Sequence, residues 1–436
     1  MRRHSGVTVT VTTAWIAALV VTMSITVGAV PAGAQSSDAP GVTAKEIRVG
    51  GIAGVTNPIG RPYKDSFNGA KAYFDMVNKA GGIYGRKYKV VANLDDQTRD
   101  SKNLLAARTL VEEKNVFAIV PMVTSSFASS KYLTGTGTPT FGWNINSNWA
   151  DGKNLFGEKG SWLCFGSDCI TMSPNFIAKQ EGAKAVGLLA YGSSPQSADC
   201  SKGQENTFGK YGPRVAFSDR SLSFGFSAND ISAGVQEVKD KGVDFIATCM
   251  DVNGEVNFQK ALQQAGLTNV KWYAPEGYDP QLLKELGKTF EENFTFAIDF
   301  LPFEAAKDSK GMQTYLKAMK KIGQEPNELS LVGWQSAMLL NRGIKDAGKD
   351  FTQASVVDAI NKITDWNADG TRTQVDWTTA HGPTPPNGDA CAAYVQVKNG
   401  KYVVVYGEKG KPFVCFPENP WPATLDNPTY KAPGET

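Results

Sequence analysis

The chain has 436 residues, of which 41% are hydrophobic and 20% are charged, and its formal net charge is +2. This length exceeds what one hydrophobic core usually serves, so we expect two globular lobes. Proteins that bind nucleic acids carry an excess of Lys and Arg that replaces the counterions of phosphate. Neither the total charge nor any local run supplies such an excess here, so we exclude that class.

The first 34 residues have the pattern of a secretory signal peptide. A basic start is followed by an uncharged stretch over residues 14–30 and by small residues at Ala32 and Ala34, where signal peptidase would cleave. A membrane span is the alternative for residues 14–30, but the stretch is short and contains threonine. We therefore expect removal of residues 1–34 and export of the remaining 402 residues, which carry 43 basic and 43 acidic side chains.

The clearest α/β pattern lies in residues 47–121. The strand-like runs IRVGGI, YKVVANLDD and VFAIVP alternate with helical stretches that end in VNKAGGIYGRK and LLAARTLVEEK. Apolar residues recur at helical spacing in the first helix, at Phe67, Ala70, Phe74 and Val77, whereas the strands are nearly continuous apolar runs. This pattern predicts a parallel sheet with helices on both faces.

The same alternation resumes after residue 166 and predicts a second parallel α/β lobe. Its expected strands are 185–190, 215–217, 245–249 and 271–274, and its expected helices are 231–241 and 257–265. Further helices are expected over 311–323, 330–347 and 352–363, before a hairpin of 392–397 and 402–406 around the turn Asn399-Gly400. The proline-rich end predicts a flexible tail over residues 416–436.

All six cysteines lie in the part expected to be exported, and an even number there predicts three disulfides. Fifteen connectivities are possible for six cysteines. We expect local pairing, because the first pair is close in sequence and the last pair brackets the hairpin. The expected pairs are Cys164–Cys169, Cys200–Cys249 and Cys391–Cys415. A zinc site would need short Cys-x-x-Cys or His spacings, and none occurs.

Residues for catalysis are scarce. After cleavage the only histidine is His381, in a stretch rich in Gly and Pro, and we interpret it as a loop residue that hydrogen-bonds its neighbours. The sequence has no Gly-x-Ser-x-Gly elbow and no phosphate-binding P-loop. Asp95 and Asp96 end a strand, where carboxylates commonly cap the next helix or fix a turn. We therefore expect a protein that is not an enzyme and that needs no cofactor or metal.

The order of these elements, with Gly81, Gly82 and Gly85 in the turn after the first helix, resembles the substrate-binding proteins of ABC importers. The resemblance is to their branched-chain amino-acid binding group and covers about residues 45–415. It implies the type I periplasmic-binding fold, an α/β architecture of two Rossmann-like lobes with parallel sheets joined by a three-crossing hinge. Lipid-anchored members need a cysteine at the new N-terminus. The first cysteine here is Cys164, so we expect no lipid anchor.

By the same resemblance, the crossings between lobes fall near residues 165, 297 and 375. Lobe 1 then comprises residues 45–165 and 297–375, and lobe 2 comprises residues 166–296 and 376–415.

A Ser/Thr segment beyond one strand of lobe 1 is a candidate ligand site. Ligands of open parallel sheets bind beyond the carboxyl ends of the strands. Thr124, Ser125 and Ser126 follow such a strand and precede an expected helix, whose free N–H groups and dipole suit a carboxylate. A plain helix N-cap is the alternative. The resemblance to the family's Ser-rich loop, which holds the ligand's α-carboxylate, favours the binding site.

A second candidate lies in lobe 2, where Pro275-Glu276-Gly277 follows the strand 271–274. It resembles the family's Pro-Glu-Gly, whose glutamate binds the ligand's ammonium. The resemblance adds three further contact positions, Tyr63, Tyr191 and Asp251.

One departure from the family occurs after the fourth strand. Where the family's amino-acid binders have small residues and a threonine, this chain has Phe141-Gly142-Trp143-Asn144. Trp143 would fill the space or stack on a flat ligand, and Asn144 offers a donor and an acceptor. Trp143 is equally compatible with a core position. Filling the space or stacking on a flat ligand would argue against a leucine-like ligand.

The sequence thus predicts a monomeric periplasmic or extracellular solute receptor. It would bind a small amino-acid-like or polar organic molecule by hinge closure and, by resemblance, deliver it to an ABC permease and its ATPase. One alternative is a chemosensory module of the same fold, which would normally be tethered to a membrane helix. The other is a secreted α/β hydrolase, against which the missing elbow and the single histidine argue.

Overall fold

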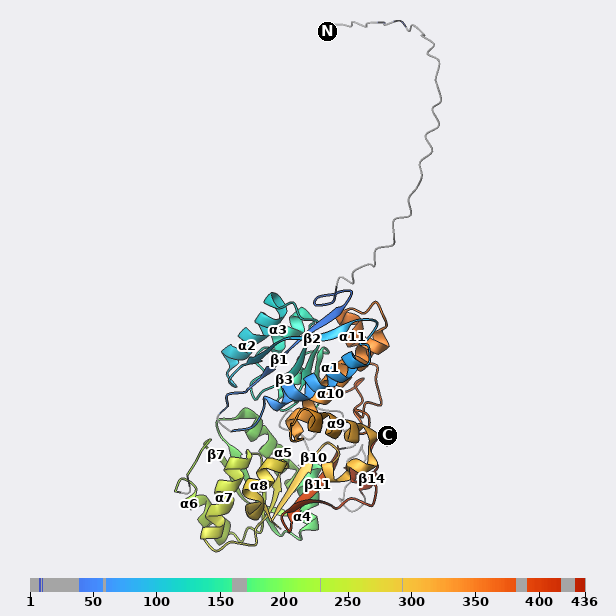
Figure 1. Ribbon diagram of the computed structural model, residues 1–436. Coiled ribbons are helices and arrows are strands. Elements are labelled where there is room, and N and C mark those ends of the chain that lie inside the picture. The colour runs from blue at the N-terminus through green and yellow to red at the C-terminus, as the bar shows by residue number, and fades with distance from the viewer. Residues whose placement is uncertain are drawn as a thin grey trace, which may run out of the picture. The chain divides into compact units, whose positions relative to one another are not determined.

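The protein folds around two β-sheets, each with helices packed against it (Figure 1). The structure is a computed structural model, and it describes residues 39–57, 60–158, 171–227, 229–291, 293–381, 390–416 and 428–435, with the single residues 8 and 10. None of the helices in these ranges has the length and apolar character needed to span a membrane.

The first sheet has five parallel strands in the order β2-β1-β3-β4-β5. Its strands are β1 (Glu46–Ala53), β2 (Lys87–Asp95), β3 (Ala118–Val123), β4 (Thr140–Gly142) and β5 (Leu155–Gly157). The helices in this part are α1 (Asp65–Lys79), α2 (Asp100–Arg108), α3 (Ser130–Thr136), α9 (Lys310–Lys321), α10 (Glu328–Ala347) and α11 (Gln353–Ile360). Short helices of other types lie at Thr109–Glu113, Ser147–Ala150 and Phe303–Asp308.

The strands of the first sheet are apolar on both faces because each face is covered. Val49 and Val120 join a core cluster with Phe74 of α1 and Trp334 of α10. Ile52, Ile119 and Met122 join a different cluster with side chains of α2 and α3. Val49 and Ile52 are separated by an odd number of positions, as are Ile119 and Val120, so the members of each pair point to opposite faces and the two clusters lie on the two sides of the sheet. Met122 does not follow this alternation, because the pairing register shifts between Ile119 and Met122. In Figure 1, α1 and α10 accordingly flank the sheet on one side and α2 and α3 on the other.

Helices α1 and α10 approach each other closely through glycines. A Cβ atom at Gly69 would lie 1.8 Å from the carbonyl oxygen of Ser330, and one at Gly333 would lie 1.9 Å from that of Ser66. Both positions therefore require glycine. This contact joins residues more than 250 positions apart in the chain, so the segment after residue 300 returns to the first sheet.

The second sheet has nine strands and is mixed. Strands β6 to β10 are mutually parallel, whereas β11 is antiparallel to its neighbours β10, β12 and β13. Its strands are β6 (Ala185–Tyr191), β7 (Arg214–Leu222), β8 (Phe245–Thr248), β9 (Lys271–Ala274), β10 (Phe294–Ile298), β11 (Ala390–Lys398), β12 (Lys401–Val405), β13 (Phe413–Phe416) and β14 (Thr429–Lys431). Its helices are α4 (Met172–Gln180), α5 (Pro195–Tyr211), α6 (Ser232–Asp240), α7 (Val252–Gln264) and α8 (Pro280–Phe290).

The predicted parallel strands and the hairpin of the second sheet are confirmed, with two differences. Helix α7 begins five residues before the predicted helix 257–265, because the side chain of Asp251 caps it by accepting from Asn253 N and Gly254 N. The flexible tail expected over 416–436 is wrong at Phe416, which ends β13, and at Thr429–Lys431, which forms β14 against β13. Tyr430 packs on the apolar cluster beneath this edge, and that packing orders a short strand.

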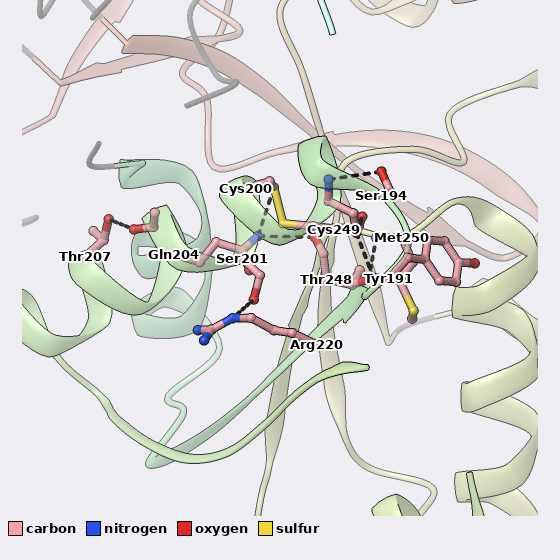
Figure 2. Close-up of a disulfide and its surroundings, with 12 residues drawn as sticks. Tyr191, Ser194, Cys200, Ser201, Gln204, Thr207, Arg220, Thr248, Cys249 and Met250 are labelled. Carbon is pink, nitrogen blue, oxygen red and sulfur yellow. Dashed lines mark hydrogen bonds between the residues drawn. A yellow bond between two sulfur atoms is a disulfide. The ribbon is translucent and has the colours of Figure 1, made fainter. Parts of the chain in front are cut away.

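Two of the three predicted disulfides are present, and they staple the second sheet. Cys391–Cys415 joins β11 to β13, and Cys200–Cys249 joins α5 to the residue after β8. Figure 2 shows the second disulfide beside Tyr191 and Met250, at the carboxyl ends of β6 and β8. Gln204 of α5 adds a hydrogen bond to Thr248 O (3.2 Å), so this helix is fixed against the end of β8. Cys164 and Cys169 lie outside the described residues.

Non-reducing peptide mapping of the native protein should therefore recover three disulfide-linked fragments, including the pair Cys164–Cys169. Opening the Cys200–Cys249 link with a double alanine variant should lower the free energy of unfolding by about 2–4 kcal/mol, because a loop of 49 residues regains entropy in the unfolded chain. Two or more free thiols in the native protein would contradict the mapping prediction.

A buried ion cluster connects the ends of the two sheets. Glu158 directly follows β5, Asp299 directly follows β10, and the guanidinium of Arg372 contacts both, at 2.9 Å to Glu158 Oε2 and 3.3 Å to Asp299 Oδ2. Trp366 Nε1 also donates to Glu158 Oε2 (3.2 Å). Arg372 is 1% exposed and Glu158 also 1%. Burial raises the pKa of Glu158, and Arg372 opposes that rise by favouring the carboxylate.

Candidate functional site

The loops at the carboxyl ends of the parallel strands carry the candidate site. Tyr63 follows β1, the Thr124–Ser126 segment follows β3, Trp143 and Asn144 follow β4, and Tyr191, Asp251 and Glu276 end or follow β6, β8 and β9. This is the edge at which parallel sheets bind ligands. Contacts among their side chains bring several of these residues together.

Arg61 is the centre of these contacts, and the sequence did not point to it. Its Nε lies 3.5 Å from Glu276 Oε2 and its Nη2 lies 3.4 Å from Glu328 Oε2. Arg61 comes from the loop after β1, whereas Glu276 comes from the loop after β9 in the second sheet. Burial alone would lower the pKa of Arg61, but the two carboxylates outweigh that effect and raise it.

The loop that presents Arg61 is held by Asn57. The amide of Asn57 donates to the carbonyl oxygens of Gly54 and Arg61, both at 2.9 Å, and its Oδ1 accepts from Arg61 N at 3.1 Å. Pro62 follows directly, and its fixed φ stiffens the turn into α1. The side chain of Arg61 is 7% exposed, so the loop delivers a cation into a largely dry environment.

Glu328 and the aromatic residues form one wall beside Arg61. Trp143 Nε1 donates to Glu328 Oε1 at 3.1 Å, and Tyr63 packs edge-on against the Trp143 ring with centroids 5.4 Å apart. Trp143 is 1% exposed and shares an apolar cluster with Leu329 and Val332 of α10. Trp143 thus lies in a packed core, and its N–H orients Glu328.

Tyr191 and Asp251 meet on the second sheet. The hydroxyl of Tyr191 donates to Asp251 Oδ2 at 3.1 Å, while Asp251 Oδ1 caps α7. Burial raises the pKa of Asp251. The capping hydrogen bonds oppose this rise, and the charge of Arg61 opposes it to a smaller extent. Burial likewise raises the pKa of the Tyr191 hydroxyl, so it remains a hydrogen-bond donor at neutral pH.

The Thr/Ser segment differs from the expectation in one respect. The expected helix follows the segment, but α3 begins only at Ser130 and has seven residues, so its N-terminus does not lie at Ser125. The helix-dipole argument at Ser125 therefore fails. Ser126 Oγ donates to Asp100 Oδ1 at 2.5 Å and Thr124 Oγ1 accepts from Ser126 N at 3.2 Å, whereas Ser125 lies half-buried with no hydrogen bond of its hydroxyl to the described residues.

Asn144, at the end of the adjacent β4, has a buried Oδ1 that accepts no hydrogen bond from the described residues. The Asn144 side chain packs closely against Gly157 of β5, because a Cβ atom added at Gly157 would lie 2.4 Å from the Cβ of Asn144. The amide is thus placed by the sheet while its oxygen stays available as an acceptor.

The residues that we interpreted as structural are structural. Asp96 accepts from Thr98 N (2.9 Å) and Asn103 Nδ2 (2.9 Å), and Asp95 accepts from Thr56 N (3.1 Å). His381 differs in detail, because it packs against Phe156 and Trp377 and its buried Nε2 makes no hydrogen bond to the described residues. Burial, aided by Lys153, lowers the pKa of His381 to about 4.

Sequence reasoning missed three charged residues, Arg61, Glu255 and Glu328. Glu255 lies one helical turn after Asp251 on α7, is 0% exposed, and neither of its carboxylate oxygens has a hydrogen-bond partner among the described residues. Arg61 lies two residues before Tyr63, in a loop for which the sequence already predicted a ligand contact. A search for charged residues within one turn of the predicted contact positions would have found both Arg61 and Glu255.

Comparisons with known proteins agree with this architecture. The family model described as "Periplasmic binding protein" matches residues 46–401. Leu/Ile/Val-binding protein homolog 8 of Brucella suis is 24% identical over 390 residues, which covers 86% of this chain and 94% of that protein.

Two solved structures share the fold. The branched-chain amino acid transporter substrate-binding protein LivJ from Streptococcus pneumoniae, in complex with isoleucine, has a TM-score of 0.67 at 18% identity, covering 83% of this chain and 99% of that one. A fatty acid ABC transporter substrate-binding protein from Thermomonospora curvata also has a TM-score of 0.67 at 18% identity, covering 86% and 94%. These relatives are substrate-binding proteins rather than enzymes.

The fold and the family match lead to one assignment. The chain has two sheets with helices packed against them and an antiparallel addition to the second sheet, and the family model matches most of the chain. The chain belongs to the periplasmic binding protein family and has its type I fold.

Proposed function

We propose that this protein is the extracytoplasmic solute-binding receptor of an ABC importer. The observation that carries the proposal is the buried contact between Arg61, from a loop of the first sheet, and Glu276, from a loop of the second. Polar groups from two sheets that meet away from water are what a ligand enclosed between two lobes requires. The lobes would be residues 45–165 with 297–375 and residues 166–296 with 376–415.

The ligand in this proposal is a small amino-acid-like or polar organic molecule. Glu276 would accept from its amine or other cationic group as a charge-assisted hydrogen bond. Ser125 and Asn144 would bind an acceptor and a donor on the ligand from the side of the first sheet, and Tyr191 would line the second. Ligands differ widely within this fold, since LivJ binds isoleucine and the protein from Thermomonospora curvata serves a fatty acid transporter.

Closure of the two lobes would follow from contacts made by both. A ligand must favour the closed form by about 5.5 kcal/mol to shift a 1:99 mixture to 99:1. Contacts from a single lobe are the same in the open and closed forms and cannot supply this difference.

The receptor would act outside the cytoplasm, as a monomer that docks on a permease whose ATPase drives import. We propose that residues 1–34 direct export and are then removed. Mass spectrometry of the secreted protein should find Gln35 as its first residue, without a lipid. A retained leader or a lipid-modified N-terminus would contradict this part of the proposal.

A thermal-shift panel of amino acids, amides, amines and small carboxylic acids tests the proposal. A ligand at 100 times its dissociation constant stabilises the folded state by about 2.7 kcal/mol, which raises the unfolding temperature measurably. At least one class should produce such a shift. Turnover of an ester or amide substrate without any saturable binding would instead favour a hydrolase.

A further inference from the structure

Glu255 is a fully buried acid on α7. Its side chain is 0% exposed and neither carboxylate oxygen has a hydrogen-bond partner among the described residues. Burying an ionised carboxylate costs several kcal/mol unless it is paired, and natural proteins rarely keep one unpaired without a functional reason. The residue therefore requires an explanation that packing does not give.

The position of Glu255 relates it to the candidate site. It lies four residues after Asp251 on the first turns of α7, so the two carboxylates share one helix face. The first turn of α7 packs closely against Tyr191, because a Cβ atom at Gly254 would lie 2.2 Å from the Tyr191 hydroxyl oxygen. Glu255 is close enough to the charges of Glu276, Asp251 and Arg61 to be affected by all three.

The carboxylates around Glu255 already have protein partners. Asp251 accepts from Tyr191 and from two backbone N–H groups of α7. Glu276 and Glu328 share the guanidinium of Arg61. Among these described residues four acids thus accompany one cation, Arg61, and Glu255 is the one of the four whose two carboxylate oxygens are both buried without a hydrogen bond to the described residues.

We propose that Glu255 determines ligand specificity by accepting a cationic group of the ligand, and that the ligand class is small organic cations: amines, amidines or guanidines with a net positive charge. This inference rests on the proposed solute-binding function and narrows its ligand. An ammonium or guanidinium group at Glu255 supplies the hydrogen bonds that the described residues do not, and it offsets the surplus of acids. A zwitterion or an anion would add a carboxylate to a site already rich in them.

The electrostatics of the site agree with this assignment. Burial raises the pKa of Glu255 well above its ordinary value, Glu276 and Asp251 raise it further, and Arg61 opposes them. A cation at Glu255 would favour the carboxylate, so binding should release a proton at pH values below the raised pKa. Two other titratable groups feel the charge of Glu255. Besides burial, this charge raises the pKa of the Tyr191 and Tyr273 hydroxyls.

Calorimetry on the purified protein tests the inference with putrescine and agmatine as cations, isoleucine as a zwitterion and benzoate as an anion. We expect a cationic probe to bind most tightly. Glu255→Gln should weaken its binding at least about thirty-fold, the lower end of the loss for removing one member of a desolvated charge pair. Glu237→Gln is the matched control, because it removes an exposed glutamate of α6 paired with Lys241 and should leave affinity unchanged.

Stability provides a second readout that separates binding from folding. The folded-state pKa of Glu255 lies above that of the unfolded chain, so its carboxyl costs stability as pH rises above the unfolded-state value. Glu255→Gln should therefore unfold at the same or a higher temperature than the parent at neutral pH, while it binds the cation more weakly. A structural role would lower the unfolding temperature instead.

The outcomes distinguish this inference from the proposed function. If isoleucine or benzoate binds and neither cation does, the cationic assignment is overturned while the solute-receptor proposal stands. If a cation binds equally well to Glu255→Gln and to the parent, the role of Glu255 is overturned. If none of the four probes binds and the wider thermal-shift panel also gives no shift, both proposals fail.

Discussion

Replacing Arg372 by methionine should lower the free energy of unfolding by about 3–5 kcal/mol, the loss observed when one partner of a buried ion pair is removed. Methionine retains much of the apolar stem of arginine but leaves Glu158, which is fully buried, and Asp299 without their cation. Urea denaturation of the ligand-free protein measures this difference through the shift in midpoint.

Two further variants define what the loss means. Arg342→Met breaks an exposed pair with Asp346 one helical turn away on α10 and should cost less than about 1 kcal/mol. Combining Arg372→Met with Glu158→Gln should recover part of the loss, because the amide carries no charge to be compensated. An Arg372→Met variant as stable as Arg342→Met would show that the cluster contributes little.

We further propose that this cluster belongs to the hinge. Glu158 follows the last strand of the first sheet, Asp299 follows β10 of the second, and Arg372 lies in the segment that precedes β11. These positions fall near the three crossings expected at residues 165, 297 and 375. The guanidinium of Arg372, which contacts carboxylates of the other two segments, would hold the three segments together while the lobes move.

Glu276→Ala and Ser125→Ala should each weaken ligand binding by about 2–5 kcal/mol, which is about thirty-fold to several thousand-fold. Glu276 would lose a charge-assisted hydrogen bond in a site that excludes water, and Ser125 would lose a hydroxyl that has no competing partner among the described residues. Calorimetry with the solute that gives the largest thermal shift measures both losses.

The contact of Glu276 with Arg61 makes the choice of controls important. Glu276→Ala also removes one of the two carboxylates that neutralise Arg61, so its unfolding temperature must be measured beside its affinity. Glu285→Ala is the control, because Glu285 is an exposed acid on the helix that follows the same loop. Unchanged affinity in Glu276→Ala would mean that the ligand does not use this carboxylate, and the amino-acid-like assignment would fall.

The sequence predicted those parts of the fold that depend on local patterns. The strands of both sheets follow from continuous apolar runs, and the hairpin of β11 and β12 follows from Asn399-Gly400. The pairs Cys200–Cys249 and Cys391–Cys415 were also predicted correctly. Strand β14 was missed, because three residues among prolines carry no periodic signal, and its order depends on pairing with β13.

The site was less predictable, since its contacts join distant parts of the chain. Arg61 meets Glu276 and Glu328, which are more than 200 residues away, and no spacing rule relates them. A lone arginine in a loop is usually solvated, so its sequence context gave no reason to expect burial. Glu255 was missed for a similar reason. The period of α7 gives it a place on a helix face but does not reveal that its carboxylate lacks a hydrogen-bond partner among the described residues.

Small-angle X-ray scattering, with and without the solute that stabilises the protein most, tests the central claim most directly. A receptor that closes on its ligand with groups from both sheets should show a smaller radius of gyration at saturation, and Glu276→Ala should show no decrease at the same solute concentration. If the parent binds the solute, as measured by calorimetry, and its radius of gyration stays the same, closure on the ligand is contradicted.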